Sequence, residues 1–162
     1  MRRPGDALPT AGRLVALDLG RVRVGVAVSD AAQVVASPSD TVDVADLDTG
    51  EAMDVPVLAA RLADVALGLG AAGVVVGAPL DLDGREGAAA REARAVADAL
   101  RERTGLPVRL VDERFTTTQA ERVLLEADVS RAGRRKVVDR VAASVLLQGV
   151  LAAQDVRRRE EG

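Results

Sequence analysis

Three consecutive valines between two glycines, Gly73–Gly77, restrict the folds that this chain can adopt. A run that is apolar at every position and rich in β-branched residues is typical of a strand buried on both faces of a parallel sheet. Parallel strands need crossover connections, which are usually helices packed on the sheet. The length of 162 residues suits one domain, and 48% hydrophobic residues are enough for its core. The run therefore predicts a single α/β domain.

The segments on either side of this strand predict a mixed sheet. Leu14–Leu19 and Arg23–Asp30 are strand-like and are joined by a turn around a glycine, which predicts an antiparallel hairpin. Val34–Pro38 predicts a third strand, and the acidic stretch Asp40–Asp54 has no regular period and predicts a loop. Val108–Val111 predicts the last strand, which brings the sheet to five.

Four segments have the apolar spacing or the capping residues of helices. They are Val55–Leu69, Ala88–Thr104, a short segment from Thr118 to about Glu126, and Arg134 to Asp155. A mixed five-stranded sheet flanked by helices is the architecture of the ribonuclease H-like α/β class. We expect a single domain of this class over residues 13–155, a flexible leader over 1–12 and a flexible tail over 156–162. No segment is typical of a signal peptide or a membrane span, so the chain is predicted to be cytoplasmic with no membrane partner.

Two residue types are missing from the chain, and their absence limits its chemistry. There is no cysteine and no histidine, which excludes disulfides, thiolate nucleophiles, Ser-His triads and nearly all zinc enzyme designs. Hydrolysis would then depend on carboxylates, hydroxyls, arginines or the single lysine, Lys136, together with a hard metal ion.

Carboxylates on three separate elements are candidates for such a metal site. Asp18 interrupts an apolar strand, where a carboxylate needs a cation or hydrogen-bond donors; a strand-end residue that bonds turn amides is the alternative. Asp112 and Glu113 end the last strand and point to opposite faces, so only one of them shares a site with Asp18. Strand alternation alone does not decide which of the two acids faces Asp18. The sequence is also compatible with Asp112 and Glu113 as an exposed pair in a loop.

Asp139 is the third candidate, at the edge of the predicted apolar stripe of the last helix. That stripe comprises Val138, Val141, Ala142, Val145, Leu146 and Gly149. The alternative is an ordinary acid at a helix boundary. Three carboxylates without histidine suit one or two Mg²⁺ or Mn²⁺ ions, which can activate water and stabilise the leaving oxygen in phosphodiester cleavage.

The charge distribution adds a possible phosphate-binding surface. The net charge is −3, and Phe115 is the only aromatic residue, so the composition does not indicate a base-stacking platform. The segment Arg131–Arg140 nevertheless carries five basic residues, namely Arg131, Arg134, Arg135, Lys136 and Arg140. It predicts phosphate binding that weakens with salt, unless the charges are simply a solvated helix face.

Four motifs in order resemble the YqgF/RuvX family, whose members are Holliday-junction-resolvase-like. They are LDLGRVRVGVAVSD (Leu17–Asp30), VVGAPLDLDG (Val75–Gly84), VDERFTT (Val111–Thr117) and ADVSRAGRRKVVDRVAASVLLQG (Ala127–Gly149). The resemblance implies a ribonuclease H-like fold and a metal-dependent endonuclease that processes the 5′ end of pre-16S ribosomal RNA. It implies Asp18, Glu113 and Asp139 as the catalytic and metal-binding acids, and so selects Glu113 over Asp112.

The nucleic-acid contacts expected beside these acids are basic residues, namely Arg23, Arg114, Arg134, Arg135, Lys136 and Arg140. The expected partner is pre-16S ribosomal RNA or a pre-ribosomal particle. A resolvase acting on branched DNA is the first alternative, and its symmetric cuts favour a homodimer over a monomer. A non-catalytic RNA-binding assembly factor is the second. A fragment of an actin-like or sugar-kinase-type ATPase is the third, although one domain is too little for a two-domain nucleotide clamp.

Overall fold

Five strands form one mixed sheet in the order β3-β2-β1-β4-β5. The computed structural model describes residues 7–79, 87–112 and 131–161, and in 131–138 it describes the backbone alone. β1 (Leu14–Asp18), β2 (Arg23–Ser29) and β3 (Ala36–Asp43) form an antiparallel meander. β4 (Gly73–Ala78) pairs with β1 in parallel, and β5 (Val108–Asp112) pairs with β4 in parallel. The predicted mixed sheet and its hairpin are confirmed.

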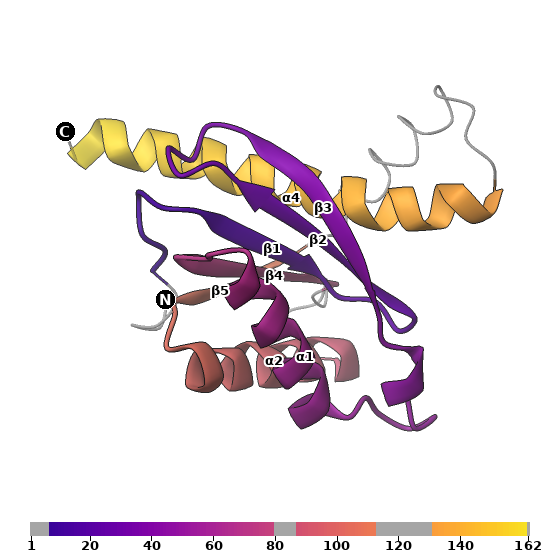
Figure 1. Ribbon diagram of the computed structural model, residues 1–162. Helices are drawn as coiled ribbons and strands as arrows, with labels where there is room; N and C mark the ends of the chain where they lie inside the picture. The colour runs from indigo at the N-terminus through magenta and orange to yellow at the C-terminus, as the bar shows by residue number, and fades with distance from the viewer. Residues whose placement is uncertain (1–6, 80–86, 113–130, 162) are drawn as a thin grey trace.

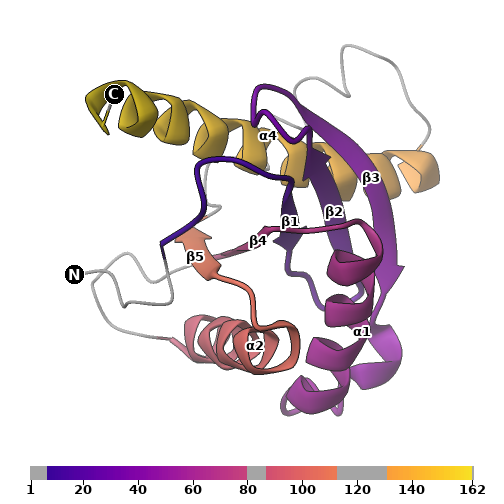
Figure 2. The same cartoon turned by 60° about the vertical axis from the view of Figure 1, so that its left-hand side comes forward.

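Helices cover both faces of the sheet (Figure 1). α1 (Val55–Gly68) and α2 (Ala88–Thr104) lie on one face, and α4 (Arg131–Glu161) crosses the other; the turned view in Figure 2 shows the same separation. Asp54 caps α1 by accepting the N–H of Val57 at 3.3 Å, and Gly105 ends α2 in the left-handed conformation that glycine adopts without strain. The predicted helix from Thr118 lies outside the described residues.

Strand alternation divides the core between the two faces. Val15, Leu17, Val74 and Val76 pack with α1 and α2, on what we call the α1/α2 face. Their neighbours Leu14, Ala16, Ala27 and Val75 pack with α4, on the α4 face. β1 and β4 are buried on both faces, which explains why their sequences are apolar almost throughout. Among the described residues, no helix is both long and apolar enough to span a bilayer.

The third strand begins and ends later than predicted. β3 covers Ala36–Asp43, so the start of the acidic stretch is strand and not loop, and a short 3₁₀ helix, Ala45–Leu47, follows it. Polar residues are tolerated because β3 is an edge strand with much of its surface exposed, and its pairing comes from the backbone of β2. Val34 and Val35 instead lie in the connection between β2 and β3, where their N–H groups donate to the Asp30 carboxylate at 2.8 and 3.0 Å. These two bonds hold the pKa of Asp30 below its ordinary value.

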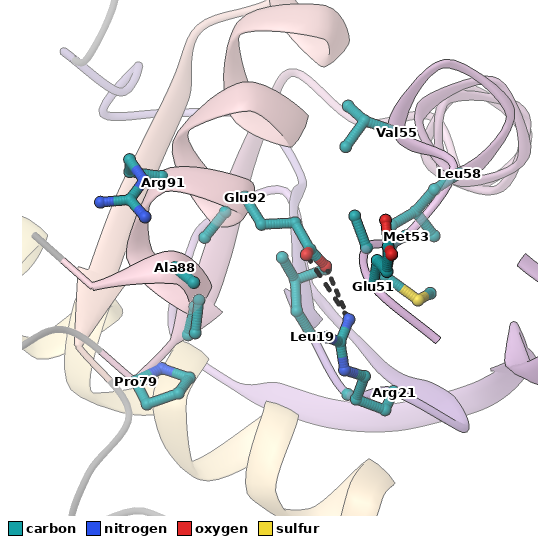
Figure 3. A pocket seen from close by; sticks show the side chains of 15 residues that line it. Leu19, Arg21, Glu51, Met53, Val55, Leu58, Pro79, Ala88, Arg91 and Glu92 are labelled. Carbon is teal, nitrogen blue, oxygen red and sulfur yellow. Dashed lines mark hydrogen bonds and ion pairs between the residues drawn. The ribbon is translucent and has the colours of Figure 1, made fainter. Parts of the chain in front are cut away.

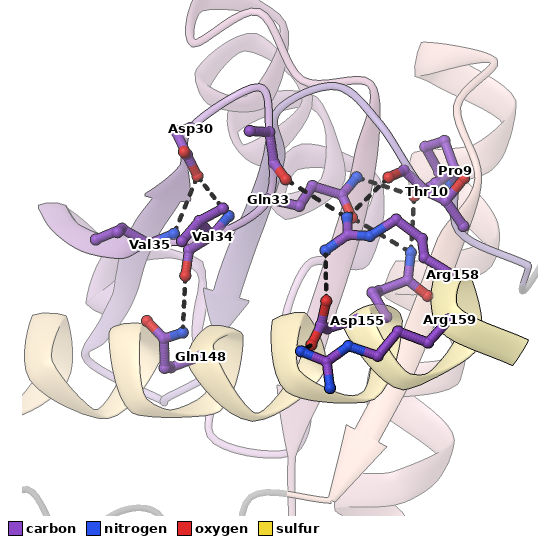
Figure 4. Close-up of polar contacts among 12 residues, drawn as sticks. Pro9, Thr10, Asp30, Gln33, Val34, Val35, Gln148, Asp155, Arg158 and Arg159 are labelled. Carbon is purple, nitrogen blue, oxygen red and sulfur yellow. Dashed lines mark hydrogen bonds and ion pairs between the residues drawn. The ribbon is translucent and has the colours of Figure 1, made fainter. Parts of the chain in front are cut away.

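The last helix is longer than predicted and continues to Glu161. Its C-terminal turns are held against the start of the chain: Arg157 donates to the carbonyl of Leu8 and Arg158 to that of Thr10, both at 3.0 Å. Figure 4 shows Arg158 reaching toward Thr10 from the helix. These contacts tie the last turns of the helix to residues 8–10, so the helix does not fray after Asp155 and the predicted end is too early. The division into domain, leader and tail stays a prediction.

The buried face of α4 is also rotated from the predicted stripe. Val141 and Val145 are half-buried and Gly149 is exposed, while the buried residues on the helix are Ala142, Ala143, Leu146, Leu147, Val150, Leu151 and Gln154. Asp139 precedes Ala143 by one turn and Leu146 by two, so it lies on this face and not at its edge. The prediction was wrong because the apolar residues of α4 allow more than one stripe, and packing on the sheet buries the stripe that contains Leu147 and Leu151.

Candidate active site

Asp18 is the last residue of the central strand, β1, and belongs to the α4 face. It follows Leu14 and Ala16 in the alternation, and both of these pack in the core beneath α4. Its cross-strand partners are glycines on both sides, Gly25 in β2 and Gly77 in β4. A carboxylate in the middle of the sheet is therefore flanked by two positions without side chains.

The two glycines allow α4 to pack closely on the sheet at the level of Asp18. A Cβ at Gly25 would overlap the backbone carbonyl of Asp139, and a Cβ at Gly77 would overlap the side chain of Leu146. The helix thus passes over β2 at Asp139 and over β4 at Leu146, with β1 and Asp18 between them. Neighbouring strands are about 4.8 Å apart, so the backbone of Asp139 lies about one strand away from Asp18. The structure brings these two predicted acids together.

The environments of the two acids differ. The Oδ1 atom of Asp18 is buried and has no hydrogen-bond partner among the described residues. Asp139 accepts a hydrogen bond on Oδ2 from Nε of Arg23 at 2.8 Å, with side-chain exposures of 30% and 20% for the acid and the arginine. Arg23 is on the same face of β2 as Gly25, which explains why it meets α4. One carboxylate is compensated by a cation, and the other has a desolvated oxygen without a partner.

An orphaned, buried carboxylate oxygen is a suitable ligand for a hard cation, because the cation supplies the partner that the protein omits. The donor set also fits Mg²⁺ or Mn²⁺, which prefer oxygen ligands. Within residues 7–79, 87–112 and 131–161, no group of three or more acidic side chains has the arrangement of a metal site. Of the three predicted metal ligands, Asp18 and Asp139 lie among the described residues and close to each other, and Glu113 lies outside them.

The end of β5 separates Asp112 from this site. Val108 and Leu110 pack in the α1/α2 core, while Val111 packs against the α4 core. Asp112 has the parity of Val108 and Leu110, so it belongs to the α1/α2 face, opposite Asp18. The face toward α4 belongs to the odd-numbered positions of β5.

The predicted basic residues are only partly described. Arg23 contacts Asp139, so the structure gives it an acidic partner that the sequence did not indicate. Arg134, Arg135 and Lys136 lie in the first turns of α4, and their side chains are outside the description, as is all of Arg114. Arg140 is half-buried, and its Nε has no hydrogen-bond partner among the described residues.

A pocket at the same strand ends was missed by sequence reasoning. It lies on the α1/α2 face, has a volume of about 610 Å³, and is lined by Leu19, Arg21, Met53, Pro79 and Glu92 among others (Figure 3). Arg21 and Glu92 are 71 positions apart and form an ion pair at 3.4 Å. No local pattern could show this contact, because it arises only when α2 packs beside the β1–β2 turn.

Comparisons with known proteins agree on one family. A family model described as "RuvX: Holliday junction resolvase" matches residues 12–153. A Cereibacter sphaeroides protein named "Putative pre-16S rRNA nuclease" is 43% identical over 154 residues, which cover 95% of this chain and 91% of that relative. An Acidiphilium cryptum protein of the same name is 42% identical over 156 residues, covering 96% and 94%.

A solved structure shares the fold. The RuvC protein of T. thermophilus, in complex with a Holliday junction substrate, superposes with a TM-score of 0.52 and 18% sequence identity. The match covers 88% of this chain and 94% of that one. The architecture is therefore RuvC-like, in agreement with the predicted ribonuclease H-like class.

Proposed function

The chain belongs to the RuvX family, and from that membership we propose that it is a metal-dependent endonuclease that processes the 5′ end of pre-16S ribosomal RNA. The named relatives support the RNA substrate, because they are pre-16S rRNA nucleases by name and are similar over nearly the whole chain. The compartment of this RNA is the cytoplasm, and the natural substrate is the RNA itself or a pre-ribosomal particle.

One observation carries the catalytic part of the proposal. The Oδ1 atom of Asp18 is buried without a partner, on the central strand and one strand from Asp139. A protein that keeps such an oxygen unsatisfied loses stability, unless a ligand completes the site. A divalent cation completes it and also explains how acids can act on an anionic RNA backbone.

Glu113 is proposed as the third acid of the site. Its odd number matches the positions of β5 that belong to the α4 face, on which Asp18 and Asp139 lie. Asp112 has the other parity. The strand alternation thus supports the same choice that the family resemblance implies.

Each residue has a separate role in this scheme. When bound, Mg²⁺ or Mn²⁺ supplies the Lewis acidity that activates water and neutralises the phosphate. Asp18 would hold the cation through Oδ1, which is buried at the end of the central strand. Asp139 is oriented by Arg23 through Oδ2, which leaves its other oxygen available. The basic first turns of α4 bind phosphates next to these acids.

A cleavage assay tests the proposal. Wild type, Asp18→Asn and the control Asp64→Asn, an exposed acid on α1, are incubated with a pre-16S 5′-leader RNA and Mn²⁺ or Mg²⁺. We expect wild type and Asp64→Asn to cut, and Asp18→Asn and metal-free wild type to be inactive. Cleavage by Asp18→Asn would contradict the catalytic assignment. In cells, rRNA processing that survives Asp18→Asn would favour a non-catalytic assembly factor instead.

A resolvase is the second candidate, since the matching family model is described as a Holliday junction resolvase. A four-way DNA junction in the same assay separates the two substrates. Symmetric cutting of two strands requires two active sites, so the resolvase also predicts a homodimer, whereas RNA trimming is compatible with a monomer. Junction cleavage by a dimer, without RNA cleavage, would replace the first proposal by the second.

A further inference from the structure

The pocket on the α1/α2 face lies directly beside the proposed catalytic acid. Leu19 follows Asp18 in the chain, and Ala78 and Pro79 follow Gly77, the strand partner of Asp18; all three line the pocket. Adjacent Cα atoms are about 3.8 Å apart. The pocket and the acidic site therefore occupy the same strand ends, on opposite faces of the sheet.

The size and lining of the pocket are those of a small-molecule site. Its volume of about 610 Å³ is within the usual range for such sites, which are mostly apolar with a few fixed polar groups. Met53, Val55 and Leu58 supply an apolar wall from the start of α1 and the loop before it. In Figure 3 these side chains lie across the pocket from Pro79 and Ala88.

The polar part of the pocket is a guanidinium that is held by two acids. Arg21 donates to Glu92 at 3.4 Å from Nη1, and its Nε lies 3.8 Å from an oxygen of Asp48. These partners come from α2 and from the segment before α1, so the guanidinium lies between two acids. An arginine plane stacks on nucleobases, and a carboxylate such as Glu92 accepts hydrogen bonds from their amino groups.

We propose that this pocket holds one unpaired nucleobase of the RNA substrate, next to the phosphate that is cut. The inference rests on the proposed function, since it takes the RNA to be bound at Asp18. A backbone that crosses the strand ends at Asp18 places the adjoining base within reach of Leu19 and Pro79. The base is then enclosed between the Arg21 plane and the apolar wall. The pocket replaces the aromatic platform that this chain, with Phe115 as its single aromatic residue, does not have.

The experiment combines a filled pocket with an abasic scan. Binding of fluorescent single-stranded RNA with the pre-16S 5′-leader sequence is measured by anisotropy in EDTA, so that no cleavage occurs. Each nucleotide in turn is replaced by an abasic residue. Ala89→Trp fills the pocket from α2, and Ala95→Trp is the matched control, because it is exposed on the same helix and does not line the pocket. Arg21→Ala, at a side chain that is 52% exposed, provides a second variant with little risk to folding.

We expect one abasic position, beside the cut site, to weaken wild-type binding about tenfold, the usual effect of losing one stacked base. Ala89→Trp and Arg21→Ala should bind the intact RNA about tenfold more weakly and lose the abasic effect at that position, while Ala95→Trp behaves as wild type. A flat abasic profile in wild type, an unchanged profile in Ala89→Trp, or no RNA binding at all would overturn the inference. If wild type cleaves the RNA but its abasic profile is flat, only the pocket proposal is wrong. If one abasic position weakens binding but no cleavage occurs, only the catalytic proposal is wrong.

Discussion

At the scale of single residues, the site is built from one unsatisfied carboxylate and one satisfied carboxylate. Asp18 has a buried oxygen without a partner in the described structure, whereas Asp139 is bonded to Arg23. Burying a charged group without compensation disfavours the folded state. If the proposed cation binds at Asp18, this asymmetry predicts that the stability of the protein responds to the cation and to the loss of each acid differently.

Asp18→Asn removes the charge and nearly preserves the shape. Without divalent metal, we expect its free energy of unfolding to exceed that of wild type by about 1 kcal/mol, since a desolvated charge is lost. With Mn²⁺ the order should reverse, because wild type gains the free energy of metal binding. Urea denaturation with and without Mn²⁺ checks both signs. An Asp18→Asn variant that is stabilised by Mn²⁺ as much as wild type would contradict a role as metal ligand.

Arg23→Gln breaks the bond that orients Asp139. The pair is partly exposed, so we expect a loss of only about 1 kcal/mol in the free energy of unfolding. Cleavage and Mn²⁺ affinity should fall by more than this loss explains, because the Asp139 carboxylate is no longer fixed by its bond to Arg23. Arg61→Gln is the control, since Arg61 makes a two-point ion pair with Asp46 at 3.0 and 3.1 Å, away from the site. Equal cleavage by the two variants would show that Arg23 has only a structural role.

At the scale of elements, the approach of α4 to the sheet decides where Asp139 lies. Gly25 and Gly77, the strand partners of Asp18, carry no side chain at the two points where the helix passes over them. Between these points, α4 presents the buried small residues Ala142 and Ala143. Close packing leaves little room for adjustment, so the position of the helix is set by the backbone itself.

Gly25→Ala tests this close approach. The added Cβ meets the backbone carbonyl of Asp139, which cannot move without a shift of α4. We expect the free energy of unfolding to fall by about 3 kcal/mol and cleavage to be lost with it. Gly149→Ala, in an exposed and open position on α4, should instead raise stability by about 1 kcal/mol. If both variants unfold like wild type in urea, α4 does not pack directly against Gly25.

At the scale of the whole molecule, the two ends of the chain are joined through α4. Gln154 donates from Nε2 to the carbonyl of Pro9 at 2.8 Å. Gln33, which lies beside Pro9 in Figure 4, donates to the same carbonyl at 2.9 Å. Both glutamines are almost fully buried, with exposures of 2% and 1%. This buried polar cluster anchors the C-terminal half of the helix that carries Asp139.

Gln154→Ala removes this anchor. We expect it to lower the free energy of unfolding by about 2 kcal/mol, because it leaves a cavity at a buried position and removes one of the two donors to the carbonyl of Pro9. Gln148→Ala, on the same helix, also loses hydrogen bonds, to Val34 and Ala36, but at an exposed position, so about 0.5 kcal/mol is expected. Thermal unfolding of both variants measures the two losses in free energy of unfolding. Equal losses in the two variants would show that the buried cluster does not anchor the helix.

The distribution of charge is also a property of the whole molecule, since the net charge is −3 and the first turns of α4 are basic. Replacing Arg134 and Arg135 by Gln should weaken RNA binding at every sequence and reduce the salt slope by about 0.7 per lost phosphate contact. Arg159→Gln, which removes a charge at the opposite end of α4, should leave the slope unchanged. Anisotropy titrations at several salt concentrations give the slopes. Unchanged slopes in the double variant would contradict the phosphate-binding surface.

The sequence by itself determined the fold class, the hairpin, the strand Gly73–Gly77 and the candidate acids Asp18 and Asp139. These depend on local patterns, because apolar runs, glycine turns and an acid inside an apolar strand are visible without knowing what packs against them. Only the tertiary structure decided the rotation of α4, the Arg23–Asp139 pair, and the pocket closed by Arg21 and Glu92. Those features join residues that lie far apart in the sequence, 71 positions for Arg21 and Glu92 and 116 for Arg23 and Asp139. The rotation of α4 also depends on where Gly25 and Gly77 let the helix approach the sheet, which no local pattern in the chain contains.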